Sequence, residues 1–97
     1  MSRAYVIEKL TNALDALITG PGDVRSRLIT AHHCMSSLRE NDFPNHLISD
    51  RLWIKHELTK FGSVENTIGR IYYKTGVKIA KRISEIYWEI SNNEKYS

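Results

Sequence analysis

The sequence has little of several features that would point to a specialised class of protein. It contains one cysteine, Cys34, so no disulfide can form within the chain. With two prolines and five glycines, it is neither collagen-like nor rich in linkers. Its apolar runs reach only three or four residues, too few to span a membrane, and its start, MSRAYVIEKL, lacks the apolar core of a signal peptide. These absences lead us to expect a protein of the reducing cytoplasm that makes no membrane contact.

Strand patterns are also missing. No stretch of five or more residues alternates apolar with polar side chains, so we predict no strand. The apolar fraction of 41% and the charged fraction of 26% are near the globular norm, which argues against disorder in the body of the chain. A length of 97 residues suits one small domain.

Apolar residues recur instead at helical spacing. Stripes of this kind predict four helices, over residues 3–18, 23–38, 44–61 and 63–91. Gly20-Pro21-Gly22 and Gly62 separate them, while Asp23 and Ser63 are suited to cap the helices that follow. Short breaks favour antiparallel neighbours. We therefore expect one all-α domain over residues 1–97, a small four-helix bundle with a flexible tail at 92–97.

The last helix is predicted to be unusually long. Its apolar phase runs from Val64 to Ile90 straight through Gly76, whereas a DNA-reading helix-turn-helix would reset the phase at its turn. At about 1.5 Å per residue it would measure about 43 Å, which is long beside the roughly 13 Å radius of gyration of such a chain. We therefore expect it either to bend at Thr75-Gly76 or to project from the bundle. Replacing Gly76 with alanine should then leave the fold intact and stabilise it slightly.

Positive charge gathers in this last helix. Residues 1–69 contain eight Lys or Arg and eight Asp or Glu, whereas residues 70–83 carry five positive charges and no negative one. The basic residues are Arg70, Lys74, Lys78, Lys81 and Arg82. On a helical wheel the first four fall within about 80° of one another. Such a stripe suits phosphate or carboxylate binding, but it also suits a solvated face on which Glu85 pairs with its neighbours.

Four aromatic residues complete the candidate partner-binding set: Trp53, Tyr72, Tyr73 and Trp88. Both tryptophans lie off the main apolar stripes, and tryptophan is frequent among the residues that dominate interfaces. The tyrosines could stack on bases or simply cover the bundle with their hydroxyls in water. A second stripe of Val77, Ala80, Ser84 and Trp88 predicts a second packing neighbour, which can belong to another chain.

No pattern points to catalysis, a metal or a cofactor. His32, His33 and Cys34 are adjacent, so on a helix they point about 100° apart and do not converge on one ion. The segment Gly20–Asp23 matches no phosphate-binding loop, and no base pairs with a nucleophile.

We therefore expect a non-enzymatic small cytoplasmic binding protein, an adaptor, inhibitor or assembly subunit. It would act on a protein partner or a second copy of itself through its basic C-terminal helix. The alternative is a nucleic-acid-associated protein that binds the phosphate backbone through the stripe at 70–82.

Overall fold

A computed structural model describes residues 3–92 of the chain and contains helices and loops only over that range. In chain order the elements are α1 (Arg3–Thr19), α2 (Val24–Met35), the 3-10 turns η1 (Glu40–Asp42) and η2 (Asn45–Leu47), α3 (Ile48–Thr59), α4 (Val64–Ile68) and α5 (Tyr73–Asn92). The prediction of a small all-α bundle is confirmed. None of these helices, within the described residues, is long and apolar enough to cross a bilayer.

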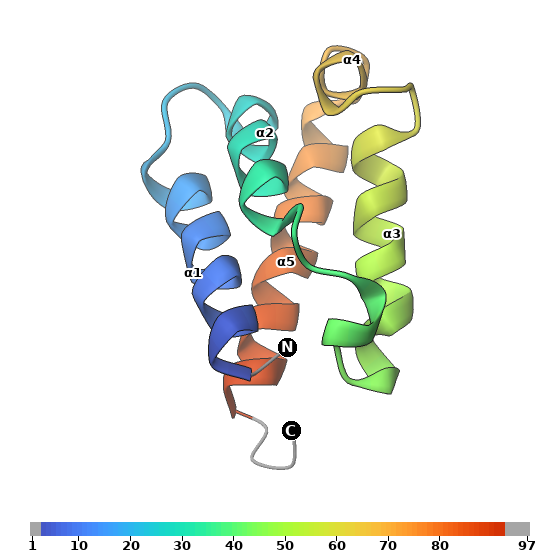
Figure 1. The fold of residues 1–97 in the computed structure, drawn as a ribbon. Coiled ribbons are helices and arrows are strands. Elements are labelled where there is room, and N and C mark those ends of the chain that lie inside the picture. The colour runs from blue at the N-terminus through green and yellow to red at the C-terminus, as the bar shows by residue number, and fades with distance from the viewer. Residues whose placement is uncertain (1–2, 93–97) are drawn as a thin grey trace.

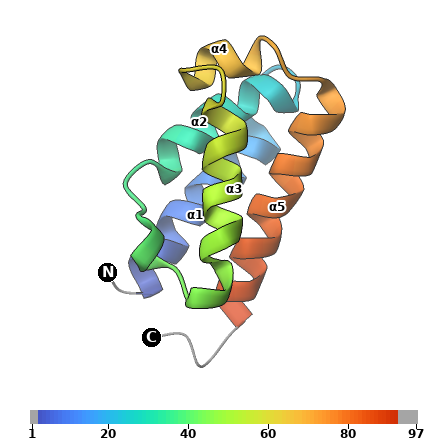
Figure 2. The ribbon, with the colours of Figure 1, turned by 90° about the vertical axis from the view of Figure 1, so that its right-hand side faces the viewer.

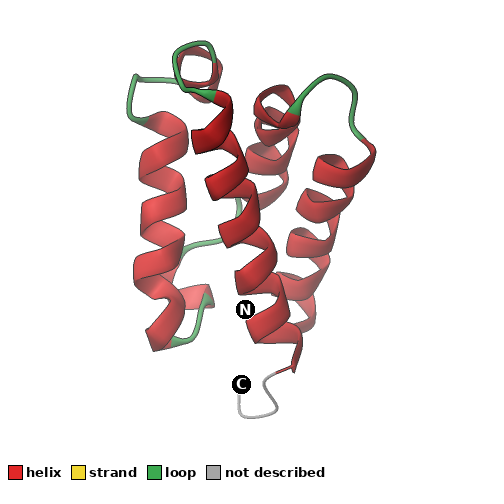
Figure 3. Cartoon of the chain, turned by 180° about the vertical axis from the view of Figure 1, so that it is seen from behind, coloured by secondary structure: helices red, strands yellow, loops and turns green. Residues whose placement is uncertain are grey.

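Four long helices stand side by side and the short α4 lies across one end (Figures 1 and 2). Along the chain α1, α2, α3 and α5 alternate in direction, which places the start of α2 at the same end as the start of α5 (Figure 1). Seen from behind, α5 runs down the middle of the bundle with α1 and α3 on either side (Figure 3). Helix α5 packs against α1, α2 and α3, so it is the central element of the fold.

The core explains why α5 is central. Its buried residues, Gly76, Ile79, Ile83, Ile86 and Ile90, recur at alternating spacings of three and four and form one face. The facing residues are Val6, Leu10 and Ala13 of α1, Leu28, Ala31 and Met35 of α2, and Ile54 and Leu58 of α3. Each fully buried Leu or Ile contributes roughly 1.5–3 kcal/mol through loss of water contact, and this apolar contact holds the helices together.

The two predicted caps are present. Asp23 Oδ1 accepts a hydrogen bond from the backbone N–H of Arg25 at 2.8 Å, and Ser63 Oγ accepts one from Asn66 at 3.0 Å. Gly22, in the loop before α2, and Gly62, in the loop before α4, have φ angles of 78° and 101°. Residues other than glycine rarely adopt such positive φ angles.

Two predicted helix ends differ from the observed ones by three residues or more. Helix α2 ends at Met35 rather than at residue 38, because the Ser36 hydroxyl donates to the carbonyl of His33 at 2.8 Å and competes with the helical ladder. Leu38 is still buried beyond the helix end, which made the apolar stripe look longer than the helix. The third helix begins at Ile48 rather than at residue 44, since η2 occupies the segment after Pro44.

The prediction of one continuous helix over residues 63–91 is wrong, because two helices, α4 and α5, occupy this segment. The chain breaks between α4 and α5, at residues 69–72, and not at Gly76. The carbonyl of Thr67 accepts from the N–H groups of both Arg70, at 2.9 Å, and Ile71, at 3.1 Å, which closes α4 in a tight final turn. Ile71 is 6% exposed although it lies in the break, so the apolar phase appeared unbroken.

Gly76 has a packing role instead. It lies buried in the first turns of α5 and faces the start of α2. A Cβ atom there would lie 3.0 Å from Cγ of Arg25 and 3.3 Å from Cγ1 of Val24. Glycine therefore lets the two helices approach closely. Of the predicted tail at 92–97, Asn92 is the last residue of α5 and the remainder lies outside the described residues.

Candidate functional site

The candidate site is the face of α5 that points away from the core. Five exposed residues, Lys74, Val77, Lys81, Ser84 and Trp88, recur there at spacings of three, four, three and four; we call them the outer row. At about 100° per residue they lie opposite the buried isoleucines. Trp88 is 67% exposed and Val77 is 42% exposed, so the row presents two large apolar side chains to solvent.

Three lysines give this face its charge. Lys74 and Lys81 belong to the outer row, and Lys78 lies on its flank toward α3. Within residues 3–92 none of their ammonium groups forms an ion pair or a hydrogen bond. They can therefore pair with negative groups of another molecule without breaking a contact of the fold.

The other two members of the predicted basic stripe are engaged elsewhere. Arg82 donates from Nη1 to Oδ1 of Asp50 at 2.6 Å and lies 3.4 Å from Oε1 of Glu85, which turns it toward α3. Arg70 belongs to the break between α4 and α5, and its guanidinium lies 5.3 Å from the centre of the Phe61 ring. The structure thus brings Lys74, Lys78 and Lys81 together and separates Arg70 and Arg82 from them.

The predicted aromatic residues also divide into separate groups. Trp53, on α3, is 38% exposed, and the guanidinium of Arg82 lies 5.9 Å from its ring centre. Tyr72 is 81% exposed in the break, and Tyr73 is 56% exposed at the first position of α5. Only Trp88 lies within the outer row, and Tyr73 borders its beginning.

Charge changes sign along α5. The lysines occupy residues 74–81, whereas Glu85 and Glu89 follow in the last turns. Glu89 lies 3.4 Å from Nε2 of His46, which connects the end of α5 to the segment before α3. A polyanion laid along the whole helix would meet the lysines first and then these carboxylates, so the positive surface is short.

A large apolar side chain is also exposed on α1. Ile18, 74% exposed, lies near the end of α1 that shares an end of the bundle with the start of α5 (Figure 3). Ala80, predicted as a member of the second stripe of α5, is half-buried and packs against the core. Val77, Ser84 and Trp88 of that stripe are exposed in the outer row, where Lys81 takes the place of Ala80.

His32, His33 and Cys34 do not converge on a common metal-binding position. The ring centroids of His32 and His33 are 5.7 Å apart, and Nε2 of His33 faces Oε2 of Glu65 at 3.5 Å. Cys34 is half-buried against the core. Over the described part of the chain, no three His, Cys, Asp or Glu side chains are grouped so that they could hold a metal ion.

One charged residue was missed by the sequence patterns. Arg51 is 4% exposed and occupies the core position of α3 between Leu47 and Ile54. Leu47, Arg51, Ile54 and Leu58 recur at four, three and four, so the signal was an arginine in the register of the apolar stripe.

Comparison with protein-family models, curated proteins and solved structures finds no match for this chain. Any inference about its function therefore rests on the geometry described above.

Proposed function

We propose that the chain is a non-enzymatic protein-binding module whose contact surface is the outer row of α5. The observation that carries this proposal is the exposure of Trp88 on the same helix face as the unpaired Lys74 and Lys81. A large exposed aromatic residue on a rigid central helix is the type of residue that anchors protein interfaces.

The partner that fits this face is a helix of another protein with an apolar stripe edged by acidic residues. The outer row repeats at the three–four spacing by which helices pack along their length. Helix α5 has 20 residues and measures about 30 Å. That length can supply most of the roughly 800 Å² that each partner buries in an interface of ordinary size. The lysines would speed encounter with an acidic partner and fix its register, while Trp88 and Val77 would supply the apolar contact.

Binding to the phosphate backbone of a nucleic acid is the second candidate, favoured by the same three unpaired lysines and by the exposed Tyr72 and Tyr73 beside them. Three phosphate contacts give a salt slope of only about two to three, which means weak binding near 150 mM salt. The carboxylates of Glu85 and Glu89 shorten the surface further. For this reason we place the protein partner first.

Site-specific photo-crosslinking in native cells tests the proposal. A photoreactive residue at Ser84, inside the outer row, should capture a defined protein that survives nuclease treatment, whereas the same residue at the exposed Asn12 of α1 should not. The captured protein is then purified and titrated. Trp88→Ala should weaken binding about tenfold or more. Lys81→Glu should also weaken it, whereas Lys60→Glu, at the C-cap of α3, should not.

Three outcomes would redirect the proposal. Capture of a second copy of the chain, with a dimer in sedimentation, would identify the partner as the chain itself. Capture of nucleic acid, and binding of a short duplex or single strand at about 150 mM salt that Lys74→Ala and Lys78→Ala abolish, would favour the second candidate. Equal capture at Ser84 and Asn12, or unchanged affinity of Trp88→Ala, would contradict the outer row as the contact surface.

A further inference from the structure

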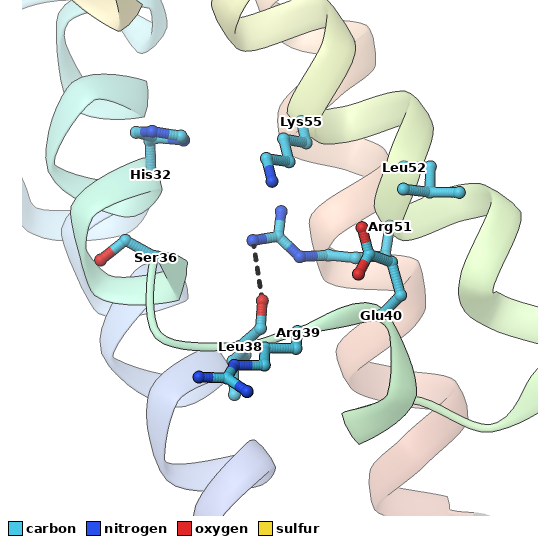
Figure 4. Close-up of a pocket in the computed structure, with 8 residues that line it drawn as sticks. All are labelled: His32, Ser36, Leu38, Arg39, Glu40, Arg51, Leu52 and Lys55. Carbon is cyan, nitrogen blue, oxygen red and sulfur yellow. Dashed lines mark hydrogen bonds between the residues drawn. The ribbon is translucent and has the colours of Figure 1, made fainter.

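A small polar cavity lies between α2 and α3, away from the outer row. Its walls include His32 of α2, Arg39 and Glu40 of the segment that follows, and Arg51 and Lys55 of α3, while the ribbon of α5 passes behind them (Figure 4). The cavity measures about 220 Å³. Pockets for drug-sized molecules measure about 300–1,000 Å³, so this one has room for a small ion or for the charged end of a small molecule.

Arg51 is the buried cation of this cavity. Its Nη2 donates to the carbonyl of Met35, the last residue of α2, at 3.1 Å and to that of Leu38 at 3.3 Å. Figure 4 shows the second of these bonds. Its Nη1 is buried, and no acceptor within residues 3–92 receives its hydrogens. No carboxylate of that range forms an ion pair with it either. Burial lowers the pKa of Arg51, and the charge of Glu40 only opposes this effect.

The other basic groups point into the same space. Figure 4 shows the amino end of Lys55 extending toward the guanidinium of Arg51, with His32 on the opposite wall. Nδ1 of His32 is also buried without a partner among the described residues. Burial lowers the pKa of His32, the charges of His33, Arg51 and Lys55 lower it further, and the charge of Glu65 opposes them. Three basic residues, Arg39, Arg51 and Lys55, line the cavity against one acidic residue, Glu40, so its charge is positive on balance.

We propose that this cavity binds a small oxyanion: a phosphate, or the carboxylate of a small molecule. A buried arginine without a counterion is costly, and an anion beside it both compensates the charge and accepts the hydrogens that are left over. Nη1 of Arg51 donates to one oxygen and the ammonium of Lys55 to another. Nη2 of Arg51 already donates to two carbonyls, so the guanidinium cannot bind the anion through both of its terminal nitrogens. Lys55 is therefore the second donor to the anion.

Glu40 is the internal competitor of the anion. Among the charged groups around Arg51 it is the one whose negative charge acts on the guanidinium, and it lines the same cavity. Neutralising it should therefore strengthen anion binding, whereas neutralising Lys55 should weaken it. A purely structural arginine, present only to hold the end of α2, predicts neither effect.

The test is a titration of the isotopically labelled full chain with inorganic phosphate, followed by NMR at ionic strength held constant with sodium chloride. Amide shifts should centre on Leu52, Lys55 and His32. Lys55→Ala should weaken phosphate binding about tenfold, since a hydrogen bond between charged groups contributes about that factor. Glu40→Gln should strengthen it severalfold. Lys78→Ala, which removes the same charge from α5, should leave it unchanged and is the matched control.

Two further arms complete the experiment. Acetate that produces the same shifts as phosphate would identify a carboxylate ligand, and shifts with phosphate alone would identify a phosphate ligand. Arg51→Met should abolish the rise in melting temperature that phosphate gives; if this variant does not fold, the Lys55 and Glu40 variants still decide. The proposal fails if phosphate acts no differently from chloride, if the shifts lie on the lysines of α5, or if Lys55→Ala and Lys78→Ala bind phosphate equally.

Discussion

Replacing Gly76 with alanine is the sharpest test of how α5 packs on α2. Alanine in a helix is favoured over glycine by about 0.8–1.0 kcal/mol, so the helix alone predicts a more stable protein. The structure opposes this gain. The new Cβ would lie 3.0 Å from Cγ of Arg25, 3.3 Å from Cγ1 of Val24 and 3.6 Å from Cδ1 of Leu28. The first two distances are shorter than most Cβ contacts, so both side chains would have to shift by a few tenths of an ångström.

The neighbours of Gly76 have little freedom to move aside. Arg25 is held at its far end by Asp23, at 2.9 Å, and by the carbonyl of Ile71, at 3.3 Å, and Val24 is branched at Cβ. Overpacking of this kind costs about 1–3 kcal/mol. After the helix gain is subtracted, we expect Gly76→Ala to lower the free energy of unfolding by about 1 kcal/mol, or roughly 4–8 °C in melting temperature.

Chemical denaturation followed by circular dichroism measures this change, and two comparisons make it specific. Gly69→Ala is the control, because the nearest atoms to a Cβ there are 3.7 Å away, and it should be neutral. In the Arg25→Ala background, which removes the closest atom, Gly76→Ala should become neutral or stabilising, giving a coupling of about 1 kcal/mol in a double-mutant cycle. A Gly76→Ala protein that is more stable than the parent by the full helix gain, with no coupling to Arg25→Ala, would refute the close contact of α5 with α2.

Three other perturbations have a defined direction. Ile90→Ala, at a position that is 0% exposed, should cost about 2–5 kcal/mol of unfolding free energy in urea, whereas Ile18→Ala, at 74% exposure, should cost less than about 0.5 kcal/mol. Ser63→Ala removes the acceptor of a 3.0 Å hydrogen bond from the backbone N–H of Asn66 and should lower the free energy of unfolding by roughly 0.5–2 kcal/mol. Ser63→Asp, which keeps a good N-cap, is the control, and an equal loss in both variants would show that the cap is unimportant. The lowered pKa of His32 means that the unfolded chain binds its proton more readily than the folded one; the contribution of His32 to stability is therefore present above pH 6.5, the ordinary value, and lost as pH falls toward the lowered value. Urea titrations between pH 5 and 8 (about one pH unit or more on either side) should show this loss in the parent and less of it in His32→Gln; identical pH profiles would disprove the assignment.

Much of the fold could be predicted from the sequence, because local rules and the apolar pattern agree there. The Gly20-Pro21-Gly22 break, the Asp23 cap and the absence of strands follow from turn chemistry and helical spacing, and the structure has all three within residues 3–92. The interruption at residues 69–72 could not be predicted in the same way. Ile71 is buried from a non-helical segment, so the spacing of apolar residues continues although the helix does not.

The candidate site was predicted only in part, since long-range pairing decides which charges remain free. Five basic residues look equivalent along the sequence from 70 to 82, but Asp50 lies 32 positions from Arg82 and takes it out of the group. Arg51 was overlooked for the opposite reason. Its position in the apolar register indicates burial, yet only the structure shows that no carboxylate within residues 3–92 pairs with it there.

The distribution of free charge connects the two proposed sites. Most carboxylates of the described chain are committed to a nearby base: Asp23 to Arg25, Asp50 and Glu85 to Arg82, Glu57 to Lys60, Glu65 to His33 and Glu89 to His46. Six of the basic residues left over fall into two groups: Lys74, Lys78 and Lys81 lie on or beside the outer row of α5, and Arg39, Arg51 and Lys55 line the cavity between α2 and α3. Four others lie elsewhere: Arg3, Lys9, Arg27 and Arg70.

These two surfaces are separated by the isoleucine face of α5, which packs against the core between them. The outer row points away from that core, whereas the cavity is lined by α2, α3 and the segment that joins them. A protein on the outer row would therefore leave the cavity open, and an oxyanion in the cavity would leave Trp88 and the three lysines accessible. Because no side chain lines both surfaces, any effect of one ligand on the other has to pass through the packing of Ile79, Ile83 and Ile86 rather than through direct competition.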